Sequence, residues 1–231
     1  MAVVPDVGGK NMQTVIFDAY GTLFDWSGVA IAAQQTSATP ELAQDIAQQW
    51  RKLHLELAWQ STLMERYQDF DRLAAQSLDI VLRQTLLPSD QQARLRESLL
   101  QAAMELAVYP DVIPTLSDLT ARTAILSNGT LHALQKLADR AGILFSFDYI
   151  LSVDPVRSYK PSRKAYAFAM GRLGAEKADI TFVSSNAWDV AGAKAFGFRT
   201  CWCNREEKPF EALPYHPDIT ISDLRQLVEH V

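Results

Sequence analysis

The chain has 231 residues, of which 48% are hydrophobic and 21% are charged, and its formal net charge is -5. Such a composition is typical of a globular protein with a sizeable apolar core, built as one large domain or as one domain that carries an insertion. The acidic balance excludes a basic stripe that could bind nucleic acid, and no apolar run approaches the length of about 20 residues that a membrane helix needs.

The N-terminal stretch "MAVVPDVGGKNM" precedes the first predicted strand. It lacks the basic start and apolar run of a secretory signal peptide, so we expect a cytoplasmic protein with no membrane partner. The strand itself is "TVIFD", residues 14 to 18, and Asp18 stands where its apolar run stops. A single Asp after a strand is most often a turn or cap residue, so Asp18 alone identifies no site.

A helical block follows, from about residue 28 to residue 106. It is almost free of glycine, and its apolar residues recur at helical spacing, as in "AQDIAQQWRKLHLELAWQSTL". Pro88 predicts a break between two helices, and we expect Ser89 to be the N-cap of the second. The sequence shows no internal repeat and no low-complexity linker.

After "VYPDVIPTLSDL" the pattern changes to short apolar runs that alternate with helical segments. Alternation of this kind predicts an α/β fold, with a parallel sheet flanked by helices. The first strand belongs to that sheet. We therefore expect a core formed by residues 1–27 and 107–231, with residues 28–106 as a helical insertion.

The cysteine and histidine residues give no sign of a metal or redox centre. Cys201 and Cys203 follow an apolar stretch in "TCWCN" and are interpreted as packing residues. The four histidines have no metal-ligand spacing, and none accompanies a G-x-S-x-G motif. A hydrolase driven by histidine is thereby disfavoured.

Polar side chains gather where the predicted strands end. In an open parallel sheet, ligands bind at the carboxyl ends of the strands. Each segment alone has a plain explanation, as a turn, a surface charge or a helix cap, but four of them in this order predict an active site. The residues are Asp18, Ser127 with Asn128, Lys160 in "DPVRSYKP", and Ser184, Asn186 and Asp189 in "ITFVSSNAWD".

These segments resemble the haloacid dehalogenase superfamily. Asp18 to Thr22 match its D-x-x-x-T motif, and Ser127, Lys160 and Asp189 match its second, third and fourth motifs in order. The stretches "FDAYGTLFD", "ILSNG", "LSVDPVRSYKP" and "FVSSNAWD" are similar to those of the L-2-haloacid dehalogenases. The resemblance implies a Rossmann-like core, a helical cap domain at residues 28–106, a small 2-haloacid substrate and a homodimer.

The position of Tyr20 distinguishes between two branches of that superfamily. Its phosphatases carry D-x-D and a carboxylate early in the fourth motif, which helps to hold Mg²⁺. Here the second Asp is replaced by Tyr20, and the fourth motif begins with Ser184, Ser185 and Asn186. We therefore predict a hydrolase of carbon-halide bonds that uses no metal and no cofactor. A magnesium-dependent phosphatase and a non-catalytic binding protein are the alternatives.

By resemblance, Asp18 attacks C2 of an L-2-haloacid from the face opposite the halogen, and water then hydrolyses the aspartyl ester to a D-2-hydroxyacid. Lys160 is expected to keep Asp18 ionised. The other catalytic residues that the resemblance implies are Thr22 and Ser184, which orient Asp18, Tyr166 near the nucleophile, and Asp189 with Asn186, which position or activate the water.

The resemblance also implies a substrate site. Its members are Ser127 and the backbone N–H groups of Ala19 and Tyr20 for the substrate carboxylate, Arg51 and Asn128 for the departing halide, and Phe70 and Trp188 as apolar pocket residues. Without the resemblance, Arg51 would be taken as a solvated residue on a helix face, and each aromatic residue as part of the core.

Overall fold

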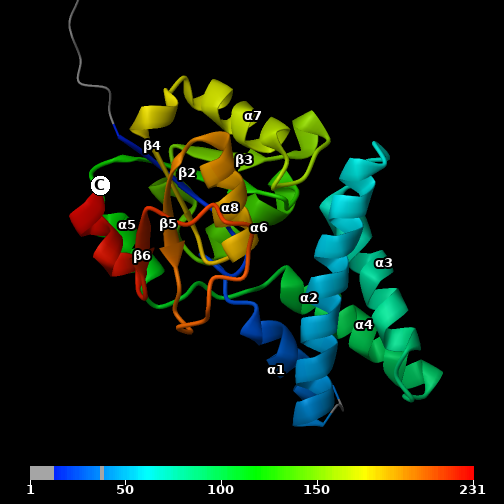
Figure 1. The fold of residues 1–231 in the computed structure, drawn as a ribbon. Coiled ribbons are helices and arrows are strands. Elements are labelled where there is room, and N and C mark those ends of the chain that lie inside the picture. Colours follow the sequence, from blue (N-terminus) through cyan, green and yellow to red (C-terminus); the bar gives the residue numbers. More distant parts are fainter. Residues whose placement is uncertain (1–12, 37–38) are drawn as a thin grey trace, which may run out of the picture.

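The computed structural model describes residues 13–36 and 39–231 of the chain. Within these residues, six strands form one parallel sheet in the order β3-β2-β1-β4-β5-β6. The strands are β1 (Thr14–Phe17), β2 (Arg122–Ser127), β3 (Tyr149–Ser152), β4 (Ile180–Ser184), β5 (Arg199–Cys203) and β6 (Ile219–Ile221). This is the predicted α/β fold (Figure 1).

Strand β1 lies in the interior of the sheet, and its alternate side chains enter two different cores. Phe17 pairs in register with Ile125 of β2 and Val183 of β4. Phe17 belongs to one buried cluster and Ile16 to the other. Both faces are covered, which explains why "VIF" is an unbroken apolar run rather than an alternating one. The chain that leaves β1 therefore emerges in the middle of the sheet.

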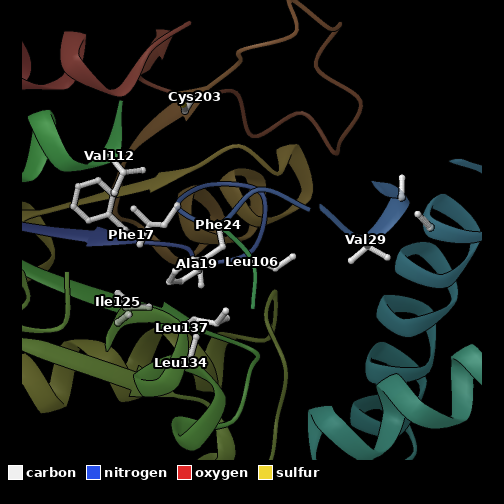
Figure 2. Close-up of a cluster of buried hydrophobic side chains, with 14 of the residues drawn as sticks. Phe17, Ala19, Phe24, Val29, Leu106, Val112, Ile125, Leu134, Leu137 and Cys203 are labelled. Atoms are coloured by element: carbon white, nitrogen blue, oxygen red, sulfur yellow. The ribbon is translucent and has the colours of Figure 1, made fainter. Parts of the chain in front are cut away.

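Helices cover both faces of the sheet. From residue 112 onward the α-helices are α5 (Val112–Asp118), α6 (Leu131–Arg140), α7 (Arg163–Leu173) and α8 (Ala187–Phe196). Short 3₁₀ helices lie at Leu144–Ser146, Asp154–Val156, Lys177–Asp179 and Leu224–His230. Side chains of α5, α6 and the last 3₁₀ helix share the cluster of Phe17, whereas α7 and α8 share that of Ile16. Figure 2 shows part of the first cluster, with Leu134 and Leu137 of α6 beside Ile125.

The segment between β1 and α5 forms a group of helices beside the sheet (Figure 1). They are α1 (Ser27–Gln35), α2 (Pro40–Leu63), α3 (Phe70–Arg83) and α4 (Ser89–Ala103). Trp50 of α2 is fully buried, and its indole N–H donates to the Ala74 carbonyl of α3 over 2.9 Å. The first buried cluster continues from the sheet through Phe24 and Leu106 to Val29 of α1 (Figure 2), so the helices and the sheet share apolar packing.

Helix starts follow local chemistry, with one correction to the sequence-based expectation. Thr39 caps α2, and Asp69 caps α3 by accepting from the Arg72 N–H over 2.8 Å. Ser89, predicted as an N-cap, is instead the first helical residue of α4, and Pro88 holds the cap position without a side-chain hydrogen bond. The proline ring keeps the φ of Pro88 at -57° with an extended ψ of 149°, so Pro88 takes the cap position and the helix begins one residue earlier than expected.

Three other expectations concern the cysteines, a membrane-spanning helix and the division into domains. Cys201 and Cys203 are free and buried in the first cluster, as expected for packing residues. None of the helices in the described part of the chain is long and apolar enough to span a bilayer. The division into a core of residues 1–27 and 107–231 and a cap of residues 28–106 stays a prediction, and residues 1–12 and 37–38 lie outside the described residues.

The packing of α6 on the sheet yields a test of the core. Leu134 is fully buried, whereas Leu131, one turn earlier on the same helix, is 43% exposed. We expect Leu134→Ala to lower the free energy of unfolding by about 2–5 kcal/mol, because the lost contacts leave a cavity. The matched Leu131→Ala variant should change it by less than about 0.5 kcal/mol. Equal losses in urea unfolding would contradict this packing.

Candidate active site

The predicted site residues converge because parallel strands end at one edge of the sheet. Asp18 follows β1, Ser127 ends β2, and Ser184 ends β4. Lys160 comes from the loop between β3 and α7, and Asp189 lies in the first turn of α8. The sequence order of the motifs thus becomes a single cluster in space.

The Asp18 carboxylate is 5% exposed and held by donors on both oxygens. Oδ2 accepts three hydrogen bonds, from Thr22 Oγ1 at 3.0 Å, Ser184 Oγ at 3.3 Å and Asn186 Nδ2 at 2.7 Å. Oδ1 accepts from Lys160 Nζ at 2.8 Å. This uneven arrangement fixes the carboxylate in rotation and leaves Oδ1 the less engaged of its two oxygens.

Lys160 joins Asp18 to a second buried carboxylate. Its side chain is 1% exposed, and Nζ donates to Asp18 Oδ1, to Asp189 Oδ2 at 2.6 Å and to the Leu126 carbonyl at 2.8 Å. These bonds use all three ammonium hydrogens. Burial alone would lower the pKa of Lys160, but the charges of Asp18 and Asp189 raise it above the ordinary lysine value. Lys160 is therefore a cation at neutral pH.

Asp189 lies behind Lys160 and has no exposed surface. Burial raises the pKa of its carboxyl group to about 6, and the charge of Asp18 adds to this, whereas Lys160 opposes it. The Tyr166 hydroxyl donates to Asp189 Oδ1 at 2.7 Å. Burial and the charge of Asp189 raise the pKa of Tyr166 well above its ordinary value, which keeps its hydroxyl a donor.

Backbone contacts hold Lys160 in place. Its N–H donates to Asn128 Oδ1 over 2.8 Å, and its carbonyl accepts from the Trp59 indole N–H over 3.1 Å. Asn128 follows β2, and Trp59 belongs to α2. The lysine loop is therefore fixed by the sheet on one side and by the helical insertion on the other.

Arg51 of α2 connects the helical insertion to the loop after β1. Its Nη2 donates to the Tyr20 carbonyl at 3.2 Å and to Asn186 Oδ1 at 3.1 Å. Gly21, with φ 84°, allows this approach, because a Cβ there would come within 2.4 Å of Nη2. Burial lowers the pKa of Arg51, and the charge of Asp18 opposes that shift. A guanidinium remains protonated in such surroundings, so a second cation stands at the site.

A small cavity of about 40 Å³ opens beside Asp18. This is room for about three water-sized positions, and thus for a small ligand. The residues that line it come from the strand ends and from the helical insertion: Asp18, Tyr20, Trp26, Arg51, His54, Leu55, Phe70, Ser127, Asn128, Asn186 and Trp188.

Other predicted site residues lie behind this lining. Thr22, Ser184 and Lys160 bond directly to Asp18, whereas Tyr166 reaches Asp189 rather than Asp18. The Ala19 carbonyl accepts from the N–H groups of the next turn. Ser127, in contrast, is part of the lining, and its Oγ accepts from the Gly129 N–H over 3.1 Å. The sequence thus identified both a layer that faces the cavity and a layer that supports it.

Three residues of the cavity wall were not predicted: Trp26, His54 and Leu55. His54 lies one helical turn after Arg51, and this spacing places both on one face of α2. Burial lowers the pKa of His54 to about 4, with its contact to the Phe70 carbonyl opposing the shift. The ring is therefore neutral at pH 7, and Nε2 donates to that carbonyl over 2.9 Å.

Arg205, after β5, was also missed. It forms a double hydrogen bond to Asp111, with Nε at 3.0 Å and Nη2 at 2.9 Å from the carboxylate oxygens. Nη2 also donates to the Thr22 carbonyl and Nη1 to Ser185 Oγ, both at 3.1 Å. Arg205 thus ties together the two loops that carry donors to Asp18. Nothing in "CNREEK" marks this residue in the sequence.

Comparisons with known proteins bear on the family of the chain. A family model described as haloacid dehalogenase-like hydrolase matches residues 12–197. The chain is 40% identical over 221 residues to an (S)-2-haloacid dehalogenase of Pseudomonas sp. (strain YL), with 94% of each chain covered. It is 36% identical over 222 residues to haloacetate dehalogenase H-2 of Moraxella sp. (strain B), with 95% of this chain and 97% of that one covered.

A solved structure is also similar. It is that of L-2-haloacid dehalogenase from Xanthobacter autotrophicus with chloropropionic acid covalently bound. The sequence identity is 34% and the TM-score is 0.84, and the match covers 94% of this chain and 97% of that one.

The buried charges at Lys160 lead to a pH-dependent prediction. In Lys160→Met two buried carboxylates lose their cation, and we expect the free energy of unfolding at pH 8 to fall by about 3–5 kcal/mol. The pKa of the Asp189 carboxyl is already raised to about 6, and without the opposing charge of Lys160 it rises further above its unfolded value. The variant therefore loses stability as pH rises through the folded-state pKa of Asp189. The loss should therefore be smaller at pH 5 than at pH 8, as measured by urea unfolding.

Lys194 supplies the matched control. Its pair with Asp218 is about one third exposed, and Lys194→Met should cost no more than about 1 kcal/mol at either pH. A loss for Lys160→Met that is the same at pH 5 and pH 8 would show that Lys160 does not oppose the raised pKa of Asp189.

Proposed function

This chain belongs to the haloacid dehalogenase-like hydrolases, and from that premise we propose that it is an (S)-2-haloacid dehalogenase. It hydrolyses L-2-haloalkanoic acids, including haloacetates, to (R)-2-hydroxyacids and halide. The observation that carries this proposal is the strand-tip carboxylate of Asp18, which pairs with Lys160 and faces a small cavity. Among the described residues, no other carboxylate lines that cavity.

The first step is a displacement at carbon. Oδ1 of Asp18 attacks C2 on the face opposite the halogen, the carbon-halogen bond breaks, and the halide leaves with the bonding electrons. We assign the attack to Oδ1 because Lys160 is its hydrogen-bond donor, whereas Oδ2 is occupied by three donors. The products are an aspartyl ester with C2 inverted and a free halide ion.

The lining of the cavity offers a place for each part of the substrate. Arg51 provides a cation for the departing halide, with Asn128 beside it. We assign the substrate carboxylate to Ser127 and to the backbone N–H groups of Ala19 and Tyr20. The apolar side of C2 would then face Phe70 and Trp188. Helices α1–α4 would act as a cap that excludes bulk water while the ester forms.

The second step is hydrolysis of the ester. Water attacks the Asp18 carboxyl carbon, and negative charge develops on Oδ2, where Thr22, Ser184 and Asn186 already donate. The bond between the carboxyl carbon and Oδ1 then breaks, so Oδ1 leaves as the hydroxyl oxygen of the hydroxyacid and the water oxygen stays in the Asp18 carboxylate. We assign Asp189, with Asn186, to position the water and to take its proton. A carboxyl pKa of about 6 suits this role, because Asp189 is then ionised at neutral pH yet basic enough to accept a proton.

A magnesium-dependent phosphatase is the alternative, and the residues present do not fit its metal. Lys160 Nζ lies within 2.8 Å of Asp18 and 2.6 Å of Asp189, so the position between the two carboxylates is taken by an ammonium ion. Among the described residues, no three His, Cys, Asp or Glu side chains group as metal ligands. Tyr20 and Asn186 stand where the phosphatases carry carboxylates. These features support displacement at carbon without a metal ion. We also propose that the protein is a cytoplasmic homodimer.

Substrate assays test the proposed function. We expect halide release from (S)-2-chloropropionate in EDTA, with (R)-lactate as the product, and no release from the (R) enantiomer, because attack by Asp18 requires one face of C2. A generic phosphate ester with Mg²⁺ should not be hydrolysed. Phosphate release that depends on Mg²⁺, without halide release, would support the alternative. Formation of (S)-lactate from (S)-2-chloropropionate would contradict a single displacement at C2.

Isotope labelling tests the covalent step. In a single turnover in ¹⁸O-water with enzyme in excess, a nucleophilic Asp18 should take up the label while the new hydroxyl of the product stays unlabelled. Mass spectrometry of the Asp18 peptide and of the hydroxyacid distinguishes the two positions. Asp18→Asn should remain folded and lose activity by at least about 10³-fold, because the amide is a poor nucleophile. Label found in the product alone would make Asp18 a base that activates water.

A further inference from the structure

A second cavity adjoins the reaction cavity on its aromatic side. Its volume is about 240 Å³, against about 40 Å³ for the cavity at Asp18. Four ring-bearing residues line both cavities: Tyr20, Trp26, His54 and Phe70. The two spaces therefore lie on either side of one aromatic partition rather than at separate places on the surface.

The partition is uncharged and internally packed. The rings of Tyr20 and Phe70 lie 6.0 Å apart between centroids, those of Tyr20 and Trp26 6.4 Å, and those of His54 and Phe70 3.8 Å. His54 is neutral at pH 7, since burial lowers its pKa to about 4. The charged groups of the reaction cavity, Asp18 and Arg51, do not line the second cavity. Its near wall is therefore suited to hydrocarbon.

The far wall is formed by the helical insertion. Ala74 of α3 and Leu100 and Ala103 of α4 supply apolar surface there, followed by Met104. The described lining contains one carboxylate, that of Asp71, which accepts from the Thr130 hydroxyl over 2.8 Å. A negative charge at that end disfavours a second anion and permits an uncharged chain.

On the basis of the proposed function, we propose that this second cavity is the subsite for the alkyl chain of 2-haloacids longer than propionate. The substrate carboxylate and the halogen stay in the reaction cavity with Ser127 and Arg51. The alkyl chain of the substrate passes the aromatic partition toward Ala103 and Met104. The reaction cavity has about one sixth of the volume of the second, so a long chain needs the additional space.

A third cavity, of about 650 Å³, is the alternative location for the alkyl chain of the substrate. Of the residues that line it, Trp188 alone also lines the reaction cavity. The Trp188 ring meets the Trp59 ring edge-on at 5.4 Å between centroids, so the one shared residue is itself packed against an aromatic ring of the third cavity. The second cavity shares four lining residues with the reaction cavity, against one for the third cavity, so it adjoins the reaction cavity along a larger part of its wall.

The test compares kcat/KM for (S)-2-bromohexanoate with kcat/KM for (S)-2-bromopropionate. Each methylene that leaves water strengthens binding by about fourfold, so three of them are worth up to about 60-fold. Ala103→Leu, which fills the second cavity, should lower the hexanoate-to-propionate ratio by about tenfold or more. Met104→Ala, which enlarges the cavity, should raise it. The ratio is independent of the fraction of enzyme that is folded.

Ala195→Leu is the matched control, because Ala195 lines the third cavity and belongs to another helix, α8. It should change the ratio by less than about twofold. In addition, 2-bromoadipate, whose chain ends in a carboxylate, should react at least about tenfold more slowly than 2-bromohexanoate, and Asp71→Asn should reduce that difference.

The outcomes separate the two proposals. If the wild-type protein releases no halide from (S)-2-bromopropionate, the proposed function is overturned and the subsite with it. If it does release halide, but Ala103→Leu leaves the ratio unchanged or Ala195→Leu lowers it instead, the proposed function stands and the subsite is overturned.

Discussion

The arrangement on which the rest of the site depends is one ammonium group between two buried carboxylates. Asp18 and Asp189 are 5% and 0% exposed, and two buried carboxylates with no cation beside them would strongly destabilise the fold. Lys160 supplies that cation from a loop fixed by Asn128 and Trp59. Because the lysine lies between the two carboxylates, it holds the strand-tip carboxylate in the orientation that the proposed attack on carbon requires.

The helical insertion completes this site rather than merely covering it. Arg51 brings a second cation to the loop after β1, and the close approach of α2 depends on the absence of a side chain at Gly21. Phe70 and His54 come from the same insertion and close the apolar side of the cavity. The polar groups of the site thus come mainly from the strand ends, and the apolar wall of the cavity comes mainly from the helices. The proposed alkyl subsite lies on the helical side for this reason.

Much of the site was predictable because its geometry follows from sheet topology. Parallel strands place their carboxyl ends at one edge, so the order of Asp18, Ser127, Lys160 and Asp189 in the chain was sufficient to predict a common location. The resemblance added Arg51 and the aromatic residues, whose positions on helices carry no such rule. Three features were not predicted from the sequence. Strand β6 is short, and Ser89 proved to be the first residue of a helix rather than its cap. Arg205 makes its contacts with residues that are far away in the sequence.

By itself the sequence determined the chemical identity of the site and the class of fold, because residue type sets which groups can attack, donate or carry charge, and apolar periodicity sets which segments form strands and helices. The replacement of a second carboxylate by Tyr20 was readable without any structure. Only the tertiary structure decided that Lys160 Nζ donates its three hydrogen bonds to Asp18, Asp189 and the Leu126 carbonyl. It also decided that one aromatic partition lies between two cavities. These facts depend on the packing of side chains from distant segments, and packing is a property of the folded chain as a whole rather than of any local stretch.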